Sequence, residues 1–220
     1  METSLALHHI NIVIHVTSGS LALLTGLVIL LINKGKDTHR LLGKVFLALM
    51  CITVATGLVG VFVFGRNTFL LVITLLSGYM AFSGYRAVKY KSNKPQLLDV
   101  IIALLAIGSV AYFLYYFKSI GMIWSPVIIY STVGYLVMMV VYDLVRYLLS
   151  ARLYSKLWMH EHILKMVSAF SGLLSAFAGT VFSNYQPYSQ FLPSVLGSLI
   201  AIGFMIAYQT GKLKSTPLIR

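Results

Sequence analysis

The chain has 220 residues, of which 59% are hydrophobic and 10% charged, and its mean hydropathy is +0.88. A soluble domain is closer to half apolar and a quarter charged, so this composition excludes a water-soluble fold of this size. It predicts one integral membrane domain over residues 1–220, with the lipid bilayer as its solvent and partner. A single cysteine, Cys51, excludes a disulfide within one chain and a cysteine-based zinc site.

The net charge of +12 does not indicate a nucleic-acid partner, because the basic residues lie in short segments between hydrophobic runs. The first residues, Met1 to Ser4, have no basic region and no cleavage site follows the first apolar run. This pattern predicts that the first run is retained as a span and not removed as a signal peptide.

Seven apolar runs are each long enough to cross about 30 Å of hydrocarbon. They predict an all-α transmembrane bundle, with polar or glycine-containing breaks between the runs. The expected spans are 8–32, 41–64, 68–88, 97–117, 124–147, 158–182 and 191–208.

The basic residues predict the orientation of these spans. Fifteen of the 17 Lys and Arg residues flank the first, third and fifth breaks or lie in the C-terminal tail. The exceptions are Arg66 and Lys118. By the positive-inside rule the N-terminus is outside and the C-terminus cytoplasmic, in a membrane expected to be the bacterial inner membrane.

Small residues at four-residue spacing predict close helix packing. The sixth span carries two such ridges, Ser168/Gly172/Ala176/Thr180 and Ser171/Ser175/Gly179/Ser183. The first and second spans carry shorter ones. We therefore expect the first, second and sixth spans near the centre of the bundle.

The five acidic residues exclude several classes of chemistry. None is expected at the membrane midplane, and no carboxylate pair, glycine-rich phosphate loop or nucleophile elbow appears. Asp99 and Glu161 are expected in the first turns of the fourth and sixth spans, where a carboxylate suits the helix dipole. Glu161 also stands four residues before Lys165, a favourable helical pair.

The histidines are the better candidates for a site. His15 lies in the outer third of the first span, where it either has a function or makes an interhelical hydrogen bond. His39 and Arg40 precede the second span, and His160 and His162 are expected in the first turns of the sixth. Because His160 and His162 differ by about 200° around a helix, they cannot both face one metal. The arrangement that remains is His39 with either His160 or His162 at the cytoplasmic side.

Two segments carry a resemblance. His15-Val-Thr-Ser-Gly19 and His39-Arg40-Leu-Leu-Gly43 resemble the His-x-x-x-Gly and His-Arg-x-x-Gly motifs of an uncharacterised bacterial family of polytopic membrane proteins, a domain of unknown function. The match covers about the first quarter of the chain. A looser likeness joins Trp158, His162, Ile163, Met166, Asn184, Pro193 and Gly197 to the closing part of related proteins. The resemblance identifies candidate site residues but implies no reaction. The family is also distantly similar to b-type membrane cytochromes, in which helix histidines hold haem.

Three functions remain open. The first is binding of haem b or a metal at the cytoplasmic side, for membrane redox or cofactor handling. His39 and His160 or His162 would be ligands, Arg40 would contact a propionate, and His15 would lie nearer the outside. The second is a small-solute transporter or permease that uses His15. The third is an assembly role without chemistry, in which the small-residue ridges bind a membrane protein partner or a second copy.

Overall fold

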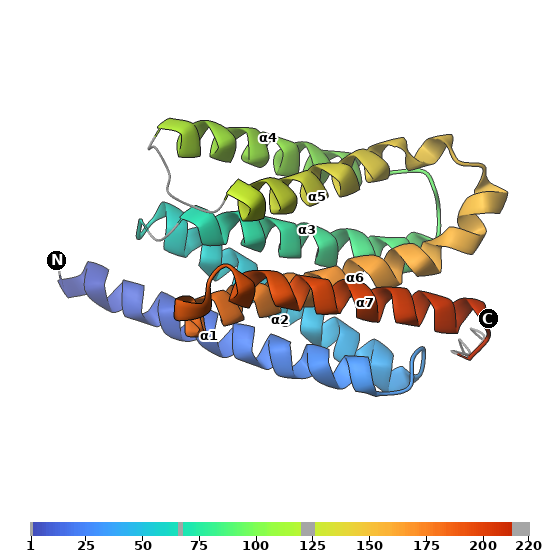
Figure 1. Cartoon of the computed structure of the whole chain (residues 1–220), viewed down its shortest axis with the longest axis horizontal. Coiled ribbons are helices and arrows are strands. Elements are labelled where there is room, and N and C mark those ends of the chain that lie inside the picture. The colour runs from blue at the N-terminus through green and yellow to red at the C-terminus, as the bar shows by residue number, and fades with distance from the viewer. Residues whose placement is uncertain (1, 66–67, 120–125, 213–220) are drawn as a thin grey trace.

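The protein is an all-helical bundle in the computed structural model, which describes residues 2–65, 68–119 and 126–212 (Figure 1). Within these ranges there are seven long α-helices, two short 3-10 helices and no strands. The long helices are α1 (Glu2–Leu31), α2 (Asp37–Phe62), α3 (Thr68–Tyr90), α4 (Leu97–Ser119), α5 (Pro126–Val145), α6 (Ala151–Val181) and α7 (Tyr188–Gln209). The 3-10 helices are η1 (Arg146–Leu148) and η2 (Ser183–Tyr185).

All seven long helices of the described chain are long and apolar enough to cross a membrane. The predicted all-α fold with seven spans is therefore confirmed, and it fits a multi-pass membrane protein. The expected fifth span began at Trp124, which lies outside the described residues, as do Arg66, Lys214 and Arg220.

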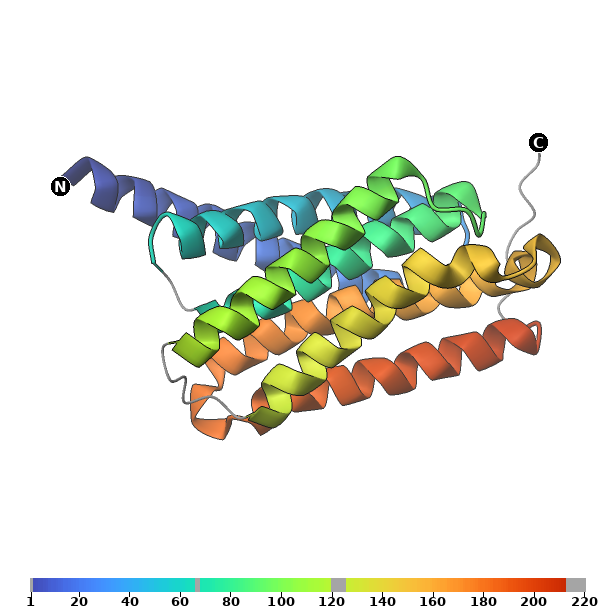
Figure 2. The ribbon, with the colours of Figure 1, turned by 90° about the horizontal axis from the view of Figure 1, so that it is seen from above.

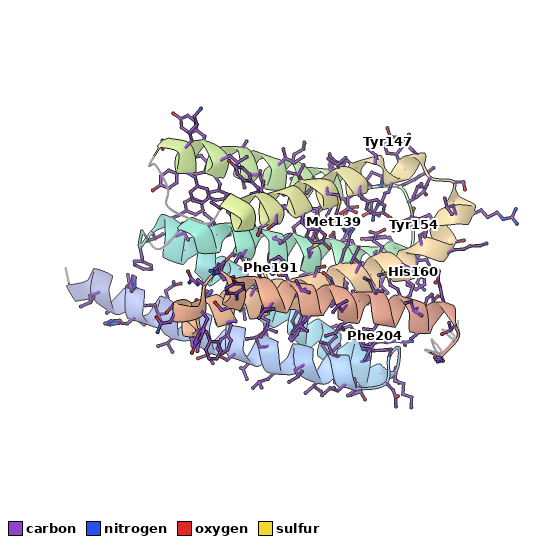
Figure 3. The ribbon with its side chains drawn as sticks, in the orientation of Figure 1. Met139, Tyr147, Tyr154, His160, Phe191 and Phe204 are labelled. Carbon is purple, nitrogen blue, oxygen red and sulfur yellow. The ribbon has the colours of Figure 1, made fainter. Side chains whose placement is uncertain are left out.

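The helices run up and down, so α1 begins and α7 ends at opposite ends of the bundle (Figures 1 and 2). We call one end the basic end. It holds the α1–α2, α3–α4 and α5–α6 connections and the last turn of α7. Tyr154, His160 and Phe204 lie toward this end, and Phe191 lies toward the other (Figure 3).

The centre of the bundle is α3 packed along α6, with α7 on the far side of α6. Of the residues in the most apolar stretch of α3, 67% are buried, against 22% in α1 and 17% in α2. The expectation that the first and second spans are central is therefore wrong. Their small residues face each other, as where Gly19 packs on Thr53. Most residues in the apolar stretches of α1 and α2 are not buried within the protein.

The two ridges of α6 do pack closely, as predicted. A Cβ on Gly172 would lie 2.2 Å from Ser77 Oγ of α3, and a Cβ on Gly197 of α7 would lie 1.7 Å from Ser171 Oγ. At Gly172 a larger side chain would displace the Ser77 hydroxyl group, and at Gly197 it would also meet Ser171 Cβ at 2.7 Å. Glycine here therefore sets the distance between α6 and its two neighbours.

Helix α6 begins seven residues earlier than expected. Ser150 caps it, because its side chain accepts a hydrogen bond from the Leu153 backbone N–H at 3.2 Å. Glu161 is thus ten residues inside the helix, and the expectation that it lies in the first turn and meets the helix dipole there is wrong. His160 and His162, expected in the same first turn, lie nine and eleven residues after the start of α6. Asp99 does lie in the first turn of α4, where its carboxylate accepts from the Gln96 backbone N–H at 2.8 Å.

Candidate functional site

A cavity of about 530 Å³ lies near the basic end, among α1, α2, α3, α6 and α7. Its walls are mainly apolar and include Leu47, Val88, Met166 and Phe170. Gly26 of α1 and Gly43 of α2 also line it. The cavity has the size and the apolar lining of a small-molecule or cofactor site.

Two of the predicted histidines line this cavity from different helices. His39 lies in the first turn of α2, and His162 lies in α6. The His162 Nδ1–H donates a hydrogen bond of 2.9 Å to the Gly84 carbonyl oxygen of α3. No described residue bonds the other ring nitrogen, Nε2, which is left free to act as an acceptor or a metal ligand. His39 Nδ1 is buried and has no hydrogen-bond partner among the described residues.

The other two predicted histidines lie apart from the cavity. His160 is turned away from His162, as the helix geometry predicts. Its Nδ1 bonds the Lys156 carbonyl oxygen at 3.1 Å, and its ring lies edge-on to Tyr208. His15 lies in the half of α1 away from the basic end, where its Nδ1 is 3.1 Å from the Thr53 carbonyl oxygen and 3.0 Å from Thr56 Oγ1. The expected interhelical hydrogen bond of His15 is therefore present.

The rim of the cavity is positively charged. Lys34, Arg40, Lys44 and Lys91 all line it, and no acidic residue does among the described residues. Arg40 is exposed and pairs loosely with the exposed Asp37 at 3.5 Å, so its guanidinium remains accessible to a ligand. Lys91 lies over the Trp158 ring at 4.6 Å. The rim would therefore attract an anionic group.

Lys34 has a structural role as well as its charge. Its Nζ donates to the carbonyl oxygens of Ile29, Leu30 and Ile32 at 2.8–3.0 Å, which closes the C-terminal end of α1. Burial lowers the pKa of this ammonium group. Since its three N–H groups are used, Lys34 offers a ligand its charge and no further hydrogen bond.

A cluster of four charged residues lies on the other face of α6. Lys165 is completely buried, and its Nζ pairs with Asp143 Oδ1 of α5 and with Glu161 Oε1, the latter at 2.6 Å. Arg146 of η1 pairs with Glu161 Oε1 at 2.5 Å. The predicted Glu161–Lys165 pair is therefore present. Two acids and two bases make the cluster neutral, which reduces the cost of burying each charge.

Tyrosine hydroxyl groups complete the cluster. Tyr79 of α3 donates to Asp143 Oδ2 at 2.7 Å, and Tyr142 and Tyr154 donate to Glu161 Oε2 at 3.1 and 2.9 Å. Each carboxylate oxygen thus has a partner, as buried charges require. Because its members come from α3, α5, η1 and α6, the cluster ties three long helices together.

A second buried ion pair joins α3 to α4. Arg86 Nε and Nη2 donate to the two carboxylate oxygens of Asp99 at 2.6 and 2.9 Å, and Nη2 also donates to Gln96 Oε1 at 2.8 Å. This pair is bidentate. It fixes the α3–α4 connection and has the geometry of a structural contact.

The ionic cluster was not predicted as a unit, although the sequence contains a signal for it. Asp143 and Arg146 are three residues apart and Glu161 and Lys165 four apart, so each pair shares a helix face. Both pairs lie in apolar runs that are adjacent in the chain. Lys165, which was grouped with the basic residues flanking a break, is in fact buried in the middle of α6.

The cavity offers one or two imidazole side chains to a ligand and does not form a complete metal-binding site from protein side chains alone. No group of three or more His, Cys, Asp or Glu side chains in the described ranges is placed to hold a metal ion. The cavity instead combines apolar walls, an accessible imidazole nitrogen and a cationic rim. No protein-family model, curated protein or solved structure matches this chain.

Proposed function

We propose that the protein binds haem b in the cavity beside α6, as a membrane redox or cofactor-handling protein. The observation that carries this proposal is the presence of His39 and His162, from two helices, on one apolar cavity with a cationic rim. Haem combines an apolar macrocycle, an iron that accepts imidazole and two anionic propionates. Each part corresponds to a group that the cavity offers.

His162 is the stronger candidate for an axial ligand. Its Nδ1–H is held by the Gly84 carbonyl oxygen at 2.9 Å, which places the lone pair on Nε2. Histidines that bind metals usually have this second contact, because it fixes the tautomer and the ring orientation. Haem needs only one such ligand, so the fit does not depend on His39.

His39 and Arg40 are candidates for the second ligand and for a propionate contact. His39 is half-buried with an unpaired Nδ1, and Arg40 lies next to it with an exposed guanidinium. Arginine suits a carboxylate because its planar group donates two parallel hydrogen bonds. We do not include His160 or His15 in the proposed haem site, since neither lines the cavity.

The test is a visible spectrum of protein purified from haem-replete cells, oxidised and then reduced with dithionite. We expect a Soret band and sharp reduced α and β bands. His162→Ala should lose the bands, whereas the matched control His160→Ala, two residues away on the other side of the helix, should retain them. A flat spectrum, or full haem occupancy in His162→Ala, would contradict the proposal.

Membership of the unknown-function family is a second proposal, supported by the positions of its motif residues. His15 and Gly19 meet Thr53 of α2, and His39, Arg40 and Gly43 line the cavity. The two motifs thus fall on one helix contact and one cavity wall. Sequences of other members, aligned to this chain, should vary more at His160 than at these five positions if the proposal is right.

We also infer that the basic end faces the cytoplasm of a bacterial inner membrane. The inference rests on the excess of Lys and Arg at that end and on the positive-inside rule. Cysteine labelling of intact cells with a membrane-impermeant reagent tests it.

A further inference from the structure

A line of polar side chains follows one face of α6, away from the cavity. We call it the polar seam and define it by Tyr154, Glu161, Lys165, Ser168, Ser171 and Ser175. At about 100° per residue these positions fall within an arc of roughly 120°, which does not overlap the arc of His162 and Met166. From Tyr154 to Ser175 the seam is about 32 Å long, comparable with the hydrocarbon thickness of a bilayer.

The half of the seam near the basic end is the ionic cluster. Tyr154 bonds Glu161, Glu161 bonds Lys165, Lys165 bonds Asp143, and Asp143 bonds Tyr79. These contacts form one unbroken hydrogen-bonded chain from the start of α6 to its middle. Arg146 and Tyr142 also face the cluster, and both contact Glu161.

The other half of the seam contains hydroxyl and amide groups without charge. Tyr135 of α5 and Ser168 are 2.9 Å apart, and Ser175 and Ser194 of α7 are 3.1 Å apart. Gln190 of α7 packs on Gly179, one turn beyond Ser175. Successive groups are one helical turn apart, about 5 Å along the axis, a gap that one water molecule can bridge.

Two polar atoms of the helices that pack on the seam are buried without a hydrogen-bond partner among the described residues. Ser77 Oγ of α3 points at Gly172, and the Ser77 side chain belongs to a residue only 3% exposed. Gln190 Oε1 is likewise unpaired in a residue that is 5% exposed. Buried polar atoms are rarely left unsatisfied in proteins, and ordered water usually supplies the missing bond.

We propose that the polar seam is a hydrated path that carries protons across the membrane. Charged residues inside a membrane are costly, and they commonly mark ion or proton pathways. A metal cation does not suit this path, since each carboxylate is already paired with Lys165 or Arg146. An anion does not suit it either, because the cluster is neutral and its outer half offers hydroxyl groups without a cation.

Protons need only hydrogen bonds that can exchange. A proton that enters at Tyr142, the half-buried tyrosine that bonds Glu161, adds to a Glu161 oxygen. An equivalent proton passes from Lys165 to Asp143, and bridging water would carry it on to the Tyr135–Ser168 pair. In each transfer one O–H or N–H bond breaks on the donor and one forms on the acceptor. Lys165 regains its proton from Glu161, so the cluster returns to its original charge and no electron moves.

The test uses the full-length protein in liposomes that contain a pH-sensitive dye. A potassium gradient with valinomycin sets a membrane potential, and the internal pH reports proton entry. Wild type should acidify the lumen faster than protein-free liposomes do. The rate should not change when sodium is replaced by choline, and it should be the same for protein with and without haem.

Two variants with matched controls locate the path. Asp143→Asn should lower the rate about tenfold or more, whereas Asp37→Asn, which removes an exposed carboxylate in the first turn of α2, should not. Ser175→Ala breaks the uncharged half and should also lower the rate. Its control is Ser198→Ala, whose hydroxyl bonds only the Ser194 carbonyl oxygen of its own helix.

Ser175→Ala keeps the proposal testable if Asp143→Asn does not fold, because it leaves no charge unpaired. Size-exclusion chromatography in detergent checks that each variant is folded. The proposal is overturned if wild type conducts no faster than empty liposomes. It is equally overturned if the folded Ser175→Ala variant conducts like wild type, or if conduction requires sodium.

Discussion

The Nδ1 atom of His162 lies 2.9 Å from the carbonyl oxygen of Gly84, so a backbone group of α3 holds a side chain of α6. This contact is close because Gly84 has no side chain. A Cβ there would lie 2.9 Å from Lys165 Cβ and 3.1 Å from Met166 Sδ. The same glycine therefore sets the helix separation on which both the cavity and the ionic cluster depend.

Gly84→Ala should destabilise the protein by about 1–3 kcal/mol, because the new methyl group meets the stem of Lys165 and forces the helices apart. It should also reduce haem occupancy by displacing His162. Thermal unfolding in detergent and the Soret absorbance measure the two effects. Gly108→Ala is the control, since nothing lies within 4 Å of a Cβ at that position. It should be neutral or slightly stabilising, and an equal loss in both variants would contradict the packing argument.

Lys165→Met should cost about 3–5 kcal/mol, because it leaves Asp143 and Glu161 buried with Arg146 as their remaining cation. The double variant Asp143→Asn/Lys165→Met removes one charge of each sign and should recover part of this loss. Unfolding in mixed detergent–SDS micelles gives the free energies of unfolding of wild type, the two single variants and the double variant, which form a double-mutant cycle. Strictly additive effects would show that the two side chains do not interact.

Lys34→Met should lower stability by about 1–2 kcal/mol. The substitution removes the donor that satisfies three carbonyl oxygens at the end of α1, together with the favourable charge at that helix terminus. Lys36→Met is the control, because Lys36 is exposed and its side chain does not cap α2. Melting temperatures in detergent compare the two. A similar small shift for both would mean that water replaces Lys34 without cost.

Cysteine labelling tests the orientation in the membrane. In a Cys51→Ala background, Lys36→Cys lies at the basic end and Ser183→Cys at the other end of the bundle. A membrane-impermeant maleimide added to intact cells should label Ser183→Cys, and it should label Lys36→Cys only after the membrane is opened. The reverse pattern would place the basic end outside and contradict the charge-based orientation.

The fold was largely predictable, because the seven apolar runs dominate the sequence and each needs to be a helix in lipid. The helix starts were less predictable. The segment Ser150–Leu157 is mixed in polarity, and its helical state depends on the Ser150 cap and on Tyr154 packing inward at 1% exposure. Helix propensity and hydropathy do not predict this tertiary packing contact.

The candidate site was predictable in part. The histidines were identified from their chemistry and helical spacing, which also separates His160 from His162. That His39 and His162 line the same cavity depends on how α1, α2, α3, α6 and α7 pack around it, which is a tertiary property. The ionic cluster required a further step, since Asp143 and Lys165 lie on different helices and only the local pair with Glu161 was visible.

Glu161 and His162 are neighbours in the chain, yet one belongs to the ionic cluster and the other to the cavity wall. A substitution scan along α6 would therefore report two different phenotypes that alternate with the period of the helix. If the effects of substitutions were averaged over adjacent positions, the two phenotypes would no longer be distinguishable. If positions three and four residues apart are grouped together, the same scan separates the ligand-binding face of α6 from its charged face.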